Sequence, residues 1–409
     1  MNSVYFLFNF ALKGLNGFYG LEKKLYICGA KSEFCMLKRP YLAALLLFAV
    51  GCMLSVSVVA QDITIGTCSI RNGKYEGEMF RGKPYGKGRA VMKNGDVFEG
   101  EYVKGKRQGY GVYTFADGER YEGEWFQDQQ HGKGTFYFRN NNKYVGFWFR
   151  DFQHGQGTMY YFNGDTYEGD WVEDKREGQG TYTYASGDSY NGTWKEDLKE
   201  GIGTFRWANG SHYSGQWHEG MMNGQGTYHY ANGDVYTGTF VNDSLHGKGI
   251  YQFSNGDRYE GSYNKSQREG DGIFTYANGN KYVGQFKGGV KHGAGTFTSV
   301  DGASYTGQWR NDEKDGRGKY VWSNGDVYDG EWRNGQMEGE GIIRQKDGGK
   351  FRGQFHEGEK HGKCIMESPD GIRFEGSYVN DVRDGDFLEK DRNGNVIRRG
   401  HYTRGIIDK

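Results

Sequence analysis

The chain has 409 residues, of which 70 are glycine, and its rings comprise 26 Phe, 32 Tyr and 9 Trp. Only 35% of the residues are hydrophobic, too few Leu, Ile and Val for an ordinary helical or α/β core, while the many rings exclude wholesale disorder. Its 52 Lys and Arg balance 52 Asp and Glu, so no overall field attracts nucleic acid. Any charged partner must be recognised locally.

A charge-free apolar run occupies residues 41–60, directly after Lys38 and Arg39. Its length is just enough to span a bilayer as one hydrophobic helix, and basic residues before such a helix favour keeping that side in the cytoplasm. We therefore expect residues 41–60 to export the chain or to anchor it in a membrane. The rest of the chain would then lie on the non-cytoplasmic side.

Three interpretations of this start remain open. Met36 begins a short basic segment and small residues end the run at Ala60, so residues 36–60 have the features of a cleaved signal peptide. Residues 1–35 would then be a spurious extension. In the second interpretation residues 1–35 are a cytoplasmic tail and the apolar run is retained as a transmembrane signal anchor. In the third, lipid is attached at Cys52.

An aromatic-x-Gly unit recurs every 23 residues after this start. Fourteen units cover residues 75–396 without an insertion, and we number each unit from its first aromatic residue, position 0. These residues are Tyr75, Phe98, Tyr121, Tyr144, Tyr167, Tyr190, Tyr213, Tyr236, Tyr259, Tyr282, Tyr305, Tyr328, Phe351 and Phe374. Residues 61–74 and 397–409 flank the array, and we expect them to cap its ends.

The spacing within a unit predicts a β-hairpin. Large residues at positions 0 and 4 share one face of an extended strand, and glycines at 11 and 13 with aromatics at 15 and 17 share one face of a second strand. Position 7 and an Asn-Gly or Asp-Gly at 19 and 20 supply the turns, and the strand glycines leave room for rings to lie over the backbone. The predicted fold is all-β: an elongated, single-layer antiparallel β-meander or solenoid of fourteen hairpins, preceded by one N-terminal hydrophobic helix.

Individual units resemble a known repeat. Tyr121-Glu-Gly-Glu-Trp125 followed by His131-Gly-Lys-Gly-Thr-Phe136 is similar to the MORN repeat (membrane occupation and recognition nexus). The resemblance implies a twisted β-meander whose aromatic groove holds partner peptides. Lipid-head-group binding has been proposed for this family, and MORN repeats are accessory modules in junctional membrane scaffolds, in plant phosphatidylinositol-phosphate kinases and in a lysine methyltransferase. We expect no appended catalytic domain beside the repeats.

The sequence offers no catalytic, cofactor-binding or metal site. The recurring Gly-x-Gly lacks the strand-to-helix context of a phosphate cradle, and we interpret it as structural. Histidines recur at position 10, but neighbouring units are about two strand widths apart and no second ligand supports a metal shell. Paired carboxylates at positions 1 and 3 recur in several units, as expected of a solvated face. We therefore expect no enzyme activity and no cofactor.

The aromatic columns are the candidate binding site. They either pack the sheet or stay partly exposed as a groove, because a single-layer sheet has no second sheet to cover it. The unit at 144–166 is unusual, since Val145 and Phe147 replace acidic residues at positions 1 and 3 of its first strand. The candidate groove residues are Tyr121, Trp125, Tyr144, Phe147, Trp148, Tyr167, Trp171, Tyr190, Trp194, Tyr213 and Trp217.

The sequence therefore predicts a non-catalytic repeat scaffold, exported or membrane-anchored, that binds a protein or peptide through an aromatic groove and does not bind nucleic acid. The alternative is a module that binds a phosphoinositide-like lipid head group or an envelope glycan. An accessory part of a phosphatidylinositol-phosphate kinase-like system is a less favoured third function.

Cleavage after Ala60 is directly testable. We expect N-terminal sequencing of the protein isolated from its host to begin at Gln61, because the small residues before it fit a signal peptidase site. A sequence that begins at any other residue contradicts this cleavage site.

Overall fold

The computed structural model describes residues 63–408. The hydrophobic helix predicted over residues 41–60, and the interpretations of residues 1–35 and 36–60, lie outside this range. Among the described residues, no helix has the length and apolarity needed to cross a membrane.

The described residues form β-strands joined by turns. In chain order the strands are β1 (Ile63–Ile70), β2 (Gly73–Phe80), β3 (Lys83–Met92), β4 (Val97–Val103), β5 (Lys106–Thr114), β6 (Arg120–Phe126), β7 (Gln129–Tyr137), β8 (Lys143–Phe149), β9 (Phe152–Tyr160), β10 (Thr166–Val172), β11 (Lys175–Thr183), β12 (Ser189–Lys195), β13 (Leu198–Arg206), β14 (His212–His218), β15 (Met221–His229), β16 (Val235–Val241), β17 (Ser244–Gln252), β18 (Arg258–Asn264), β19 (Gln267–Thr275), β20 (Lys281–Lys287), β21 (Val290–Thr298), β22 (Ser304–Arg310), β23 (Glu313–Val321), β24 (Val327–Arg333), β25 (Gln336–Arg344), β26 (Lys350–His356), β27 (Glu359–Glu367), β28 (Arg373–Val379), β29 (Val382–Arg383), β30 (Gly385–Lys390), β31 (Val396–Thr403) and β32 (Ile406–Ile407).

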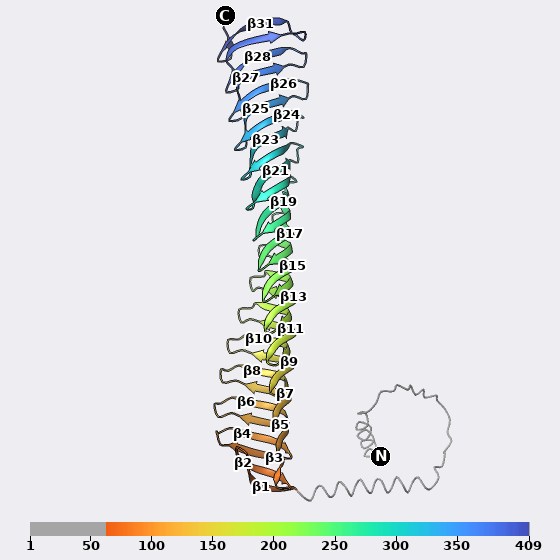
Figure 1. The fold of residues 1–409 in the computed structure, drawn as a ribbon, viewed down its shortest axis with the longest axis vertical. Coiled ribbons are helices and arrows are strands. Elements are labelled where there is room, and N and C mark those ends of the chain that lie inside the picture. The colour runs from red at the N-terminus through yellow and green to blue at the C-terminus, as the bar shows by residue number, and fades with distance from the viewer. Residues whose placement is uncertain (1–62, 409) are drawn as a thin grey trace, which may run out of the picture. The chain divides into compact units, whose positions relative to one another are not determined.

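The strands make one open antiparallel sheet. Each strand pairs with its neighbours in the sequence, as in β6–β7, β7–β8 and β8–β9. Figure 1 shows the strands stacked in chain order from β1 to β31. The predicted all-β meander of hairpins is therefore confirmed for the part of the chain that the structure describes.

Two kinds of turn alternate along the array. The short turn inside each unit places positions 6 and 7 in the left-handed region, as for Gln127 (φ 50°) and Asp128 (φ 75°), which is the type I′ pattern of a tight hairpin. In the longer turn between units, the Gly118 N–H donates a hydrogen bond to the Phe115 carbonyl at 3.1 Å. Of the predicted Asp-Gly pair, only Gly118 has positive φ (95°), while Asp117 accepts the Glu119 N–H at 3.1 Å.

The position-0 ring lies over a pair of glycines in the units that begin at residues 75 to 328, while Cys364 and Phe387 replace the second glycine in the last two units. Gly123 and Gly134 face each other across β6 and β7, and a Cβ added to either would overlap the Tyr121 hydroxyl. That hydroxyl donates to the Glu124 carbonyl at 3.0 Å. The predicted role of the strand glycines, to let rings lie over the backbone, is confirmed.

The same rings join one hairpin to the next. Tyr121 packs edge-to-face against Trp125 of its own unit, with ring centroids 5.2 Å apart, and against Trp148 of the following unit at 5.3 Å. Trp125 donates its indole N–H back to the Gly111 carbonyl of the preceding unit at 3.2 Å. Tyr121 and Trp125 therefore each contact their own unit and a neighbouring one, so this hairpin does not complete its packing alone.

Aspartates add polar clamps between units. Asp128, in a short turn, accepts the Arg107 backbone N–H of the preceding unit at 2.9 Å. Asp165, beside a longer turn, accepts the Ala185 N–H at 2.8 Å and the Tyr182 hydroxyl at 2.7 Å. These hydrogen bonds, the backbone bond first, lower the pKa of Asp165. Asp165 thus links consecutive units most strongly when it is ionised.

The ends of the array depart from the regular unit. The last unit folds as an interrupted hairpin, in which β28 pairs with the short β29 and with β30. Cys68 in β1 and Cys364 in β27 form no disulfide among residues 63–408. Burial raises the pKa of Cys364 to about 11.

Replacing a strand glycine tests the ring-over-glycine packing. We expect Gly134→Ala to lower the free energy of unfolding by ~2–3 kcal/mol in urea titrations, because its methyl group would displace the Tyr121 ring. The control, Gly118→Ala, puts a methyl group into open space at φ +95° and should cost only ~1 kcal/mol of backbone strain. Equal losses for the two variants would contradict this account.

Removing the Asp165 charge tests the clamp between units. The folded-state pKa is lowered, so the stabilisation is present above the unfolded pKa and is lost as the pH falls through the folded value. We expect Asp165→Asn to lower the free energy of unfolding by ~1–2 kcal/mol at neutral pH, and the difference from the parent protein to vanish in acid.

Asp117→Asn is the matched control for this experiment. Asn is the commoner residue at this position of the other units, and Asp117 makes only a local turn bond, so we expect little change at either pH. A loss for Asp165→Asn that is the same at neutral and acidic pH would show that ionisation of Asp165 does not support the clamp.

Candidate functional site

The structure places ten of the eleven predicted groove residues in the packed interior of the aromatic face. Their exposed fractions are 0–6%, and Phe147, on the opposite face, is 42% exposed. The ten buried residues are Tyr121, Trp125, Tyr144, Trp148, Tyr167, Trp171, Tyr190, Trp194, Tyr213 and Trp217. These ten residues therefore pack the sheet, which is one of the two interpretations of the aromatic columns. A binding role for them stays a prediction.

The cover over these rings comes from the chain itself. Half-buried rings at position 15 pack against the tryptophans, as Tyr113 does against Trp125 at 5.9 Å, and rings at position 17 pack against those at position 15, as Phe138 does against Phe136 at 4.5 Å. Position 9 of the preceding unit contributes cations that lie on the tryptophans: Arg107 lies 4.2 Å from the ring centroid of Trp125. A single sheet thus buries its rings without a second layer.

Lysines at position 9 are partly desolvated by this packing. The Lys199 ammonium lies 4.1 Å from the ring centroid of Trp217, and burial lowers the pKa of Lys199. Lys314 lies at the same distance from Trp332, with the same direction and cause of shift. We interpret these lysines as packing residues, since their alkyl stems cover rings.

The other face of the sheet, which we call the outer face, is polar over most of its length. Ion pairs and side-chain hydrogen bonds cross its strands, such as Arg89–Glu99 at 2.9 Å and the Gln179 amide to the Thr193 hydroxyl at 2.9 Å. This is the wet face that the carboxylates at positions 1 and 3 predict.

Apolar side chains interrupt this polar face around β8. Eight of them, each 38–46% exposed, project from the outer face of β6 to β10, and we call them the outer patch. Its members are Phe126, Tyr137, Val145, Phe147, Phe149, Phe152, Tyr160 and Val172. Exposed apolar residues gathered on consecutive hairpins are typical of an interaction surface.

The strand pairing explains how the patch is assembled. Val145, Phe147 and Phe149 alternate along β8 and so share its outer face, and Phe149 lies opposite Phe152 of β9. On the other side, His131 of β7 bridges two members: its ring lies 5.5 Å from Phe126 and 5.4 Å from Phe149. Three hairpins therefore contribute to one surface.

The centre of the patch lacks acidic side chains. The outer face of β7, β8 and β9 carries Lys133, Lys143, His131 and His154 but no carboxylate, while the neighbouring β6 and β10 carry acidic residues at positions 1 and 3. The lysines lie on exposed rings: the Lys133 ammonium is 5.5 Å from the Phe147 centroid, and that of Lys143 is 4.4 Å from the Tyr160 centroid. Val145 and Phe147 are predicted from the sequence, whereas the two lysines are not.

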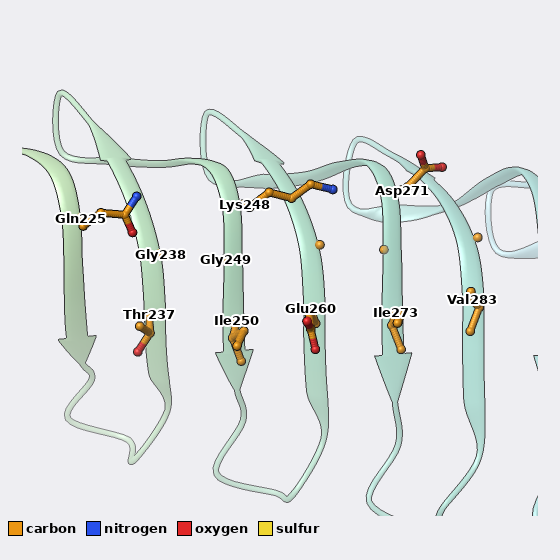
Figure 2. Close-up of a pocket in the computed structure, with 13 residues that line it drawn as sticks. Gln225, Thr237, Gly238, Lys248, Gly249, Ile250, Glu260, Asp271, Ile273 and Val283 are labelled. Carbon is orange, nitrogen blue, oxygen red and sulfur yellow. The ribbon is translucent and has the colours of Figure 1, made fainter.

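A hollow lies on the outer face between β15 and β20. Figure 2 shows Lys248 and Asp271 on one side of it and Ile250, Ile273 and Val283 on the other, with glycines between them. The hollow has a volume of about 700 Å³. Its apolar side chains are Ile250, Ile273 and Val283, fewer than in the outer patch, and Glu260 lies among them.

Metal-binding side chains do not gather within residues 63–408. No group of three or more His, Cys, Asp or Glu side chains there could hold a metal ion. The recurring histidines at position 10 belong to successive hairpins, and His131 packs between two phenylalanines.

The fold and these surfaces define an open, single-sheet repeat protein built of aromatic β-hairpins. The family model of the MORN repeat matches thirteen consecutive 23-residue units from residue 75 to residue 373. This chain belongs to the MORN repeat family. The fourteenth predicted unit, residues 374–396, is not matched, in agreement with its interrupted hairpin.

The other comparisons add no argument about function. A search of curated proteins finds no match. Among solved structures, the chain is similar to the SAS-4 (dCPAP) TCP domain of Drosophila melanogaster in complex with a proline-rich motif of Ana2 (20% identity, covering 38% of this chain and 85% of that one, TM-score 0.26). It is also similar to virginiamycin B lyase from Staphylococcus aureus (10% identity, covering 82% and 98%, TM-score 0.13). Scores this low do not support a common fold.

Proposed function

We propose that this protein is a non-catalytic scaffold, exported or membrane-anchored, that binds a protein partner through the outer patch. The observation that carries the proposal is the replacement of the usual acidic side chains of β8 by Val145 and Phe147. These side chains are 40% and 42% exposed and contribute nothing to the buried aromatic core. A repeat that needs only its ring face to fold gains no stability from rings on the wet face.

The partner would bind the outer face of the sheet, opposite the aromatic groove that the sequence predicts as the contact. The tyrosine and tryptophan columns are covered by the chain's own rings and cations, so a partner would have to displace that cover to reach them. The outer patch needs no rearrangement. Its phenylalanines and tyrosines are the residue types that supply binding energy at protein interfaces.

A membrane surface is the second candidate. Cations beside exposed rings also suit the interface of an anionic bilayer, where each basic residue contributes ~1 kcal/mol. Four cations lie on rings of the outer patch, namely Lys133, Lys143, Arg120 and Arg150, and Arg120 is paired with Glu122, which leaves fewer free charges than the polybasic cluster that such binding needs. A protein partner is therefore favoured.

Replacing Phe147 tests the proposed contact. We expect Phe147→Ser to weaken binding of a partner purified from the host by about 10- to 30-fold, because a central interface ring contributes ~1.4–2 kcal/mol or more. The measurement is titration calorimetry or interferometry with the isolated partner. The urea-unfolding midpoint should stay unchanged, since Phe147 is exposed.

Ile202→Ser is the matched control. Ile202 is a large apolar residue on the outer face of β13, 63% exposed and outside the patch, so we expect partner affinity to stay within about twofold. Unchanged affinity for Phe147→Ser would rule out the outer patch as the contact, whatever the partner.

A further inference from the structure

We infer that the outer patch takes an acidic segment of a protein partner, in which carboxylates alternate with apolar side chains. This inference rests on the proposed function and specifies the partner's chemistry. It is carried by the charges at the patch centre and by their contacts with the exposed rings.

The outer face of β7, β8 and β9, at the centre of the outer patch, carries no acidic side chain that could compete with a partner's carboxylates for the lysines. Along the outer face of β7, β8 and β9 the ionisable residues are His131, Lys133, Lys143 and His154. Val145 and Phe147 stand where most units carry polar or acidic residues, so β8 presents no carboxylate to pair with these lysines. A partner carboxylate is the group that complements them.

The two lysines lie on exposed rings of the outer patch. The Lys133 ammonium lies 5.5 Å from the Phe147 ring centroid, and that of Lys143 lies 4.4 Å from the Tyr160 centroid. Neither ammonium takes part in an ion pair among the described residues. Each therefore holds its charge beside an exposed ring, and a partner that buries the ring brings its own polar groups next to the cation.

The flanking charge limits the register of the partner. The outer face of β6 carries Glu122, which is paired with Arg120, and Glu124, and that of β10 carries Glu168 and Asp170. Carboxylates of a partner would be repelled by these strands and attracted to the three strands between them. Charge therefore centres an acidic segment on β8, while the rings supply most of the buried apolar area.

The test uses the full protein and a designed probe. The probe is a labelled peptide in which glutamate alternates with phenylalanine, and its twin carries glutamine in place of every glutamate. We expect the acidic peptide to bind at least about tenfold more tightly than the twin at low salt, and this preference to shrink as added salt screens the charges. Equal affinities, or no binding of either peptide, would overturn the inference.

Charge-removing variants locate the binding on the protein. We expect the double variant Lys133→Gln/Lys143→Gln to lose about tenfold in affinity for the acidic peptide and almost none for the twin. The matched control, Lys248→Gln/Lys281→Gln, removes lysines from the same unit positions on β17 and β20 and should bind like the parent. Equal losses in the two double variants would overturn the inference.

A membrane partner is distinguished by a parallel measurement. Flotation with vesicles containing phosphatidylserine, at moderate salt and without the peptide, should give the same bound fraction for the parent protein and for the Lys133→Gln/Lys143→Gln variant. Binding to these vesicles that the Lys133→Gln/Lys143→Gln variant loses would overturn the inference in favour of a lipid surface.

The proposed function and the inference fail separately. If Phe147→Ser weakens binding of the host partner and the Lys133→Gln/Lys143→Gln variant does not, the docking surface stands and the acidic chemistry is wrong. If neither variant affects the host partner, the docking surface itself is wrong.

Discussion

The structure depends on one contact, the aromatic ring of position 0 lying over two facing glycines. A tyrosine such as Tyr121 reaches zero exposure in a single-layer sheet only because Gly123 and Gly134 have no side chain where the ring lies. The ring then meets Trp148 of the next hairpin edge-to-face. One residue thereby supplies the core of its own unit and the interface with the next, and the strict 23-residue period follows from this double role.

This arrangement divides the sheet into two faces with different constraints. On the ring face, residues such as Tyr121 and Trp125 contact a neighbouring unit, so a substitution in one hairpin alters the packing of the next. On the outer face, side chains such as Phe147 are exposed and cross only to adjacent strands. The outer face can therefore change from acidic to apolar within a few units at little cost to folding, and recognition is more easily built there than in the core.

The sequence predicts the fold well because period and strand parity are both visible in it. Hairpins, turn positions, the role of the strand glycines and the polar outer face all follow from spacing alone. Parity also identifies Phe147, since its neighbour Trp148 belongs to the ring face. The cover of the aromatic face could not be predicted, because position 9 is Arg107 in one unit, Gln130 in the next and Leu245 in another, and no motif marks it. The role of Asp165 could not be predicted either, since its bonds to the following unit depend on three-dimensional reach.

The exposed rings of the outer patch could be buried in two ways, within the sheet or against a second molecule. A ring such as Phe147, 42% exposed, leaves roughly 100 Å² in water, and burying that area is worth ~2.5 kcal/mol at ~25 cal/mol/Å². Within this sheet the area cannot be buried, because the ring face is already filled and no second layer covers the outer face. A threonine or glutamate at the same place would solvate well and fold equally. The stabilisation that these rings can supply is therefore available only to a second molecule, and the lysines beside them restrict which molecule can use it.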